Sequence, residues 1–115
     1  MTDTISLILP TDVRYRGVAT LVLGGIGSRL DLPYERVDEL QLAVLSVLDA
    51  GAGPEVSLVV DAEDATVTVS MGPLAPGSGS DQGLAIVLER LVDEVRSEER
   101  EGEEWLALQL TNVGR

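Results

Sequence analysis

The chain contains no cysteine, no histidine and no lysine among its 115 residues. The lack of cysteine excludes disulfides, thiol catalysis and the common zinc sites. Without histidine, a Ser-His-Asp triad, histidine phosphotransfer and histidine metal ligation are excluded as well. All eight basic residues are arginine, so no lysine is available to hold a phosphate or to form a Schiff base.

Aromatic residues and long apolar runs are also scarce. Aromatics make up 3% of the chain and phenylalanine is absent, so the core must be built from Leu, Val, Ile and Ala. No apolar run approaches the roughly 18 residues of a membrane span. Met1–Ser6 lacks the basic start and the apolar segment of a signal peptide. We therefore expect one cytoplasmic domain over residues 1–115 that does not enter a membrane.

The formal net charge is −12, which disfavours nucleic acid as a partner, because phosphate contacts require clustered cations. Seven acids lie within the twelve residues 93–104, among them Glu98, Glu99 and Glu101. This cluster has two interpretations: a solubilising surface, or a patch that meets a basic protein.

Apolar residues alternate with other residues in four segments, which predicts four strands: Thr4–Leu9, Glu55–Val60, Ala65–Met71 and Trp105–Thr111. Helical spacing predicts helices over about 12–30, 33–49 and 83–96, with a flexible loop over 72–81 and an acidic connector over 97–104. Three glycines in the first helix, Gly24, Gly25 and Gly27, predict a close backbone approach or a local break. The expected fold is α+β: a two-layer sandwich with a mostly antiparallel sheet of about four strands and three helices on one face.

One segment carries a more specific signal. Ser80–Val95 reads S-D-Q-G-L-A-I-V-L-E-R-L-V-D-E-V. It resembles the second glycine box and following helix of the histidine-kinase-like ATPase fold, in particular of the anti-sigma factor serine/threonine kinase family, where G-L-G-L-A-I-V is usual. Leu9-Pro10 and the E-L-Q-L-A-V of Glu39–Val44 are similar to that family in the same order. The resemblance covers nearly the whole chain.

The resemblance also indicates where nucleotide chemistry has been lost. The family's helix Glu and Asn, which activate water or the acceptor and hold magnesium, correspond to Ser46 and Ala50, with Asp49 the nearest carboxylate. The Asp of its Asp-x-Gly motif, which reads adenine, corresponds to Ser70, followed by Gly72.

The family's phosphate-binding lid corresponds to the loop before Gly83. There, Gly77 and Gly79 could form an anion nest, or simply belong to a linker. Asp81 puts a negative charge where a phosphate would sit. Phosphoryl transfer needs a metal and positioned charge, so we expect no cofactor, the alternative being weak Mg-ATP binding.

The resemblance implies protein partners. In the family the first helix contacts sigma factors and their antagonists; its arginine corresponds to Thr20, and Arg14 and Arg16 are the substitutes. Three hypotheses remain open: a regulatory protein that binds a sigma factor or anti-anti-sigma protein without nucleotide chemistry, an active ATP-dependent kinase with displaced site residues, and a structural or dimerisation module. The resemblance also implies a homodimer, and an uncovered sheet edge next to a terminal strand would favour one.

Overall fold

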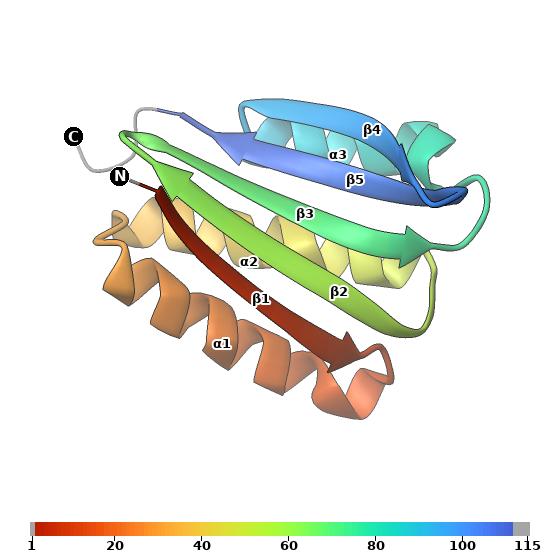
Figure 1. The fold of residues 1–115 in the computed structure, drawn as a ribbon, viewed down its shortest axis with the longest axis horizontal. Coiled ribbons are helices and arrows are strands. Elements are labelled where there is room, and N and C mark those ends of the chain that lie inside the picture. The colour runs from red at the N-terminus through yellow and green to blue at the C-terminus, as the bar shows by residue number, and fades with distance from the viewer. Residues whose placement is uncertain (1, 112–115) are drawn as a thin grey trace.

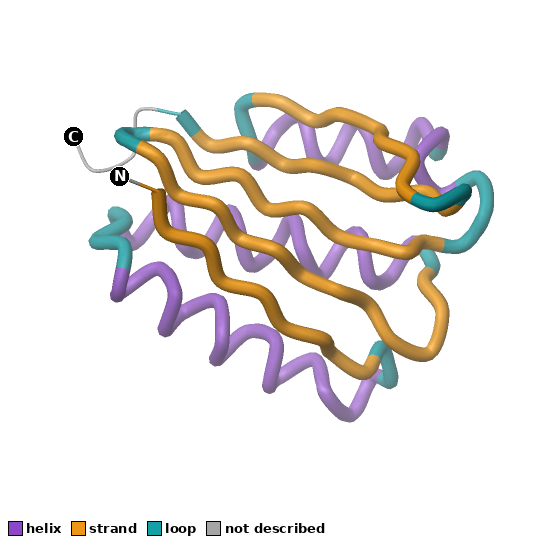
Figure 2. The backbone as a smooth tube through the Cα atoms, in the orientation of Figure 1, coloured by secondary structure: helices purple, strands orange, loops and turns teal. Residues whose placement is uncertain are grey.

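A computed structural model describes residues 2–111 of the chain. These residues form an α+β two-layer sandwich, in which three helices cover one face of a five-stranded antiparallel sheet (Figures 1 and 2). The elements are β1 (Thr2–Pro10), α1 (Arg16–Arg29), α2 (Tyr34–Ala50), β2 (Ala52–Glu63), β3 (Thr66–Leu74), α3 (Gln82–Leu91), β4 (Glu94–Arg100) and β5 (Glu103–Leu110), with short 3-10 helices at Val13–Tyr15 and Ser78–Ser80.

The strand order is β1-β2-β3-β5-β4, and every neighbouring pair is antiparallel. Two tight turns set the register. Glu63 pairs with Thr66 across the first, and Arg100 pairs with Glu103 across the second. In the second turn, Glu101 and Gly102 both have positive φ angles, of 53° and 80°. A two-residue turn of this kind matches the natural twist of a hairpin.

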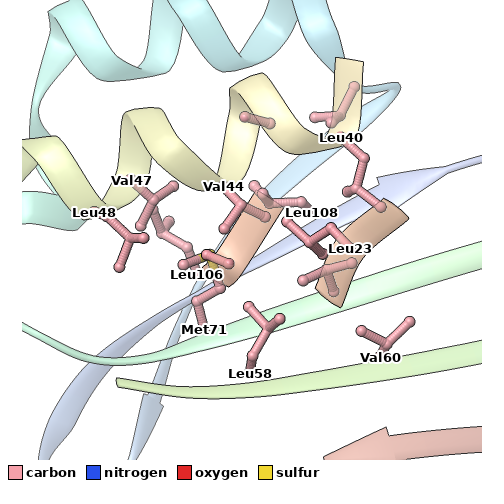
Figure 3. Close-up of a cluster of buried hydrophobic side chains, with 14 of the residues drawn as sticks. Leu23, Leu40, Val44, Val47, Leu48, Leu58, Val60, Met71, Leu106 and Leu108 are labelled. Atoms are coloured by element: carbon pink, nitrogen blue, oxygen red, sulfur yellow. The ribbon is translucent and has the colours of Figure 1, made fainter. Parts of the chain in front are cut away.

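The core between sheet and helices is aliphatic, as the composition predicts. Inward residues of the central strands, such as Leu58, Met71 and Leu108, meet Val44 and Leu23 of the helices (Figure 3). All five of these side chains are completely buried. Burying an apolar side chain of this size stabilises the fold by about 1.5–3 kcal/mol.

The glycines of α1 allow the close approach that the sequence predicts, without a break in the helix. A Cβ atom on Gly27 would lie 2.5 Å from Cγ2 of Val37 in α2, so a larger residue would push the two helices apart. Gly25, by contrast, faces open space. Only one of the three glycines is therefore required by tight packing.

Several predicted boundaries are wrong. The third helix ends at Leu91 rather than at Arg96, because Val92 is extended. The next residue, Asp93, accepts a hydrogen bond of 2.7 Å from the Thr111 amide and one of 2.6 Å from Arg36. These contacts turn the chain into β4, so the expected acidic connector is a hairpin and the sheet has five strands rather than about four.

The predicted loop over 72–81 is also partly structured. Gly72–Leu74 continues β3, and Ser78–Ser80 forms a 3-10 turn. Pro33 is the N-cap of α2 rather than its first helical residue. Among residues 2–111, no helix is both long enough and apolar enough to cross a membrane.

Candidate functional site

The residues that correspond to the nucleotide motifs lie on two different faces of the sheet. Val69 and Met71 point into the core, so Ser70 and Gly72, between and after them, belong to the face without helices. Ser70 pairs with Val59 and Ala107, and a Cβ atom on Gly72 would overlap the Trp105 indole. The structure therefore does not bring Ser70 or Gly72 together with the residues of α2.

Ser46, Asp49 and Ala50 lie in the last turns of α2, and their side chains have local roles. The Ser46 hydroxyl donates to the Leu42 carbonyl oxygen at 2.8 Å, within its own helix. Ala50 is exposed and has no polar atom in its side chain. The Asp49 carboxylate accepts a 2.6 Å hydrogen bond from Arg16. This set offers no paired carboxylate and amide for a metal ion.

The loop between β3 and α3 rests directly on the C-terminal end of α2. The Ala75 amide and the Ser78 hydroxyl both donate to the Gly51 carbonyl oxygen, at 3.4 and 3.3 Å. Ser78 is itself buried in this contact. The space between the Ser46 helix and the loop, where the resemblance would put a nucleotide, is closed at this point by the protein's own atoms.

The glycine loop does form an anion-binding arrangement, and a carboxylate of the chain occupies it. The Gly77 amide donates to Oε1 of Glu104 at 2.9 Å, and the Gly79 amide donates to Oε2 at 3.2 Å. These two backbone hydrogen bonds hold the pKa of Glu104 below its usual value of 4.5. Glu104 thus fills the position that a phosphate oxygen would take on this nest.

A second carboxylate occupies the N-terminus of α3. Asp81 is the N-cap, and its Oδ1 accepts a hydrogen bond of 2.9 Å from the Leu84 amide. Gly83 lies next to it, and a Cβ atom there would approach the same oxygen at 3.3 Å. The Leu84 amide at this helix start is therefore already hydrogen-bonded.

A cavity of about 600 Å³ opens elsewhere, at the end of the sheet where β1 finishes and β2 begins. Ile8, Pro54 and Pro73 line it, and the charged residues of its wall are Glu55 and Glu103. Carboxylates repel phosphate groups, so these two glutamates disfavour the binding of a nucleotide in this cavity.

The three first-helix residues predicted to contact partners differ in their accessibility. The Arg14 side chain is 80% exposed, and Asp12 lies 3.2 Å away. Arg16 is only 21% exposed, and its guanidinium is paired with Asp49. The Thr20 hydroxyl donates to the Arg16 carbonyl oxygen at 3.2 Å. Arg14 is thus the residue of the three that is best placed to reach another protein.

The predicted acidic residues lie on the β4–β5 hairpin, where Glu99 and Glu101 are exposed and Glu98 pairs with Arg100 at 2.9 Å. Arg14 belongs to the 3-10 helix that follows β1, whereas the hairpin includes β4, and β1 and β4 are the two edge strands of the sheet (Figure 1). With strands about 4.8 Å apart, four spacings separate the edges by about 19 Å. The two sets therefore form separate surfaces rather than one patch.

Neither a scan against models of known protein families nor a search of curated proteins finds a match for this chain. Its functional residues therefore have to be assigned from its own geometry. Glu104 is the site residue that sequence reasoning missed: it lies in an acidic run, and nothing in that run distinguishes it from Glu103. The glycines it binds, at positions 77 and 79, were recognisable from their spacing.

Proposed function

We propose that this protein is a cytoplasmic regulatory binding protein of anti-sigma type that acts on a sigma factor or an anti-anti-sigma protein without nucleotide chemistry. The observation that carries the proposal is the contact of Glu104 with the amides of Gly77 and Gly79. Because the two amides already bind a carboxylate of the chain, they are not free to bind a phosphate. What remains available to a partner is the surface of a rigid sandwich.

The charge distribution supports a basic protein as the partner. The exposed acids of the β4–β5 hairpin belong to a chain with a formal net charge of −12. Such a surface accelerates association with a cationic partner by electrostatic steering. The DNA-binding regions of sigma factors are cationic surfaces of this kind, since they must bind phosphates.

The nucleotide half of the proposal is tested by titrating the protein with Mg-ATP in a calorimeter. We expect no binding tighter than a Kd of about 100 μM, which corresponds to about −5.5 kcal/mol. Tighter binding would contradict the proposal and favour an ATP-dependent kinase. The same titration of Glu104→Gln serves as the comparison. This substitution weakens the carboxylate that competes with a phosphate for the Gly77 and Gly79 amides, and it leaves the sequence of the loop unchanged.

The partner half is tested with purified sigma factors and anti-anti-sigma proteins of the source cell. Association with the cognate protein should slow as salt rises from about 50 to 500 mM, because the Debye length falls from more than 10 Å to less than 5 Å. A Glu99→Gln/Glu101→Gln variant should also associate more slowly. Its matched control is Glu35→Gln/Glu63→Gln, which removes two exposed carboxylates away from the hairpin. If no such protein binds, the chain is a structural module instead.

A further inference from the structure

The cavity at the start of β2 lies where β2 and β3 separate. Their register pairs Ala52 with Leu74 and, as the next pair, Ser57 with Gly72. Four residues of β2 therefore stand opposite a single residue of β3, Pro73, which has no amide hydrogen to donate. The opening has a volume of about 600 Å³, within the range of about 300–1,000 Å³ that is usual for ligand sites.

The wall of this cavity is largely apolar and stiff. Ile8, a large aliphatic side chain that is 65% exposed, contributes to it from β1. Three of the five prolines of the chain line it as well: Pro54, Pro73 and Pro76. Because proline fixes its φ angle, these segments change shape little, and a ligand finds the cavity already formed.

The charges of the wall are negative, and no neighbouring cation balances them. Glu55 and Glu103 are the charged residues among those that line the cavity, and both are exposed. The register places Arg100 opposite Glu103, but its guanidinium donates to Glu98 at 2.9 Å and lies 4.5 Å from the centre of the Trp105 ring. Among residues 2–111, no salt bridge joins either cavity glutamate to an arginine.

We propose that this cavity binds an arginine side chain from an exposed segment of the partner protein. The guanidinium meets the carboxylates of Glu55 and Glu103, and the aliphatic stem lies against Ile8 and the prolines. Arginine suits such a site better than lysine, because its guanidinium is more weakly hydrated and can donate two hydrogen bonds to one carboxylate. Its methylene groups cover apolar surface while the charge remains near solvent.

This inference rests on the proposed function, since it names the group by which a basic partner is held. Leu74 of β3 pairs with Glu104 of β5, so the cavity lies at the end of the sheet that carries the turn of the β4–β5 hairpin. The exposed acids of that hairpin, Glu99 and Glu101, are therefore at the same end. They attract a cationic partner, and the cavity then fixes one of its side chains.

The test uses a blocked peptide, acetyl-Gly-Ala-Arg-Ala-Gly-amide, and the same peptide with citrulline in place of arginine. Citrulline has the length and shape of arginine but no charge. In a nuclear magnetic resonance titration of the isotope-labelled protein, the arginine peptide should bind with a Kd on the order of 1 mM. It should shift the amide signals of Ile8, Gly53 and Ser57, which line the cavity. The citrulline peptide should bind about tenfold more weakly, because it lacks the charge.

A pair of double variants tests the two carboxylates. Glu55→Gln/Glu103→Gln should weaken binding of the arginine peptide about tenfold and leave binding of the citrulline peptide unchanged. Glu35→Gln/Glu63→Gln is the matched control, because it removes two exposed carboxylates outside the cavity and changes the net charge equally. The control should bind both peptides as the wild type does.

A second pair of variants tests the apolar wall. Ile8→Ser should weaken binding of both peptides, because each loses its contact with the isoleucine side chain. Ile86→Ser should weaken neither, since Ile86 is 57% exposed but lies on α3. Both variants should fold, because neither side chain is buried, and circular dichroism checks this.

Three results would overturn the proposal. One is the absence of shifts at the cavity amides with about 10 mM arginine peptide. Another is equal binding of the arginine and citrulline peptides, or an equal loss of binding in the two double variants. The third is tighter binding of n-butylamine than of the arginine peptide at the same amides, which would make the cavity a site for a free amine.

These titrations need no sigma factor, so they separate this inference from the proposed function. Selective binding of the arginine peptide by a protein that binds no sigma factor would support the cavity site and contradict the anti-sigma role. Binding of a sigma factor without any effect of the arginine peptide on the cavity would overturn the cavity site alone.

Discussion

Arg16 Nη1 and Asp49 Oδ1 lie 2.6 Å apart, and this ion pair fastens the start of α1 to the end of α2. The arginine is mostly buried and the aspartate is 72% exposed. From the sequence, Arg16 was expected on a partner surface and Asp49 in a nucleotide pocket. In the structure the two side chains form an ion pair with each other, and this pair connects two helices.

A double-mutant cycle should show a small coupling free energy between Arg16 and Asp49. Arg16→Gln, Asp49→Asn and the double variant are expected to yield a coupling free energy of about 0.2–1 kcal/mol in urea unfolding, because solvent screens the exposed carboxylate. The coupling should decrease in 1 M salt. A coupling that is zero at low salt would show that the two side chains do not meet in solution.

The sequence predicted the strands and helices whose apolar period is clear, and missed the one strand that lacks it. β4 has a single apolar residue, Val95, so it looks like an acidic connector. Its one available signal was Gly102, because glycine adopts the positive φ angle that the second position of a two-residue hairpin turn requires. The end of α3 was not predictable locally, since it depends on Asp93 meeting Thr111, eighteen residues away.

The candidate site was less predictable than the fold, because it depends on which face of a strand a side chain occupies and on long-range partners. The period of two places Met71 rather than Ser70 on the helix side, which alternation alone could have indicated. The pairing of Glu104 with Gly77 and Gly79 joins segments 27 and 25 residues apart. No local pattern identifies which of several neighbouring glutamates makes it.

Two glycines of α1 should respond in opposite ways to the same substitution. Gly27→Ala should destabilise the protein by about 1–3 kcal/mol, because its methyl group would press on the stiff Val37 side chain. Gly17→Ala should stabilise the protein by up to about 1 kcal/mol. A Cβ atom added at Gly17 meets no other atom within 4 Å, and alanine favours a helix. Urea unfolding measures both. Equal effects would contradict the close contact between α1 and α2.

The N-cap of α3 should be replaceable by another capping residue but not by alanine. Asp81→Ala is expected to cost about 1 kcal/mol, because the Leu84 amide loses its acceptor, whereas Asp81→Ser should cost less. Thermal unfolding of the two variants shows whether Asp81 stabilises the helix through its capping hydrogen bond or through its negative charge. If serine were as harmful as alanine, the hydrogen bond would not be the reason for Asp81.

The contribution of Glu104 to the free energy of unfolding should decrease as the pH falls. Its folded pKa is lowered by the amides of Gly77 and Gly79, so the ionised carboxylate favours the folded state. This stabilisation is complete above the unfolded pKa, near 4.5, and is lost as pH falls through the lower folded pKa. Glu104→Gln should therefore be less stable than the wild type by a constant amount between pH 7 and 5, and the difference should shrink below that range.

The neighbouring residue supplies the control for this experiment. Glu103 lines the cavity of about 600 Å³ and accepts no hydrogen bond from Gly77 or Gly79, so Glu103→Gln removes the same charge and leaves both amides bonded to Glu104. Hydrogen exchange provides the local measurement: at pH 7 the Gly77 and Gly79 amides should exchange faster in Glu104→Gln than in the wild type or in Glu103→Gln. If exchange at both glycines is the same in all three proteins, the carboxylate does not occupy the nest, and the main support for a nucleotide-independent function is removed.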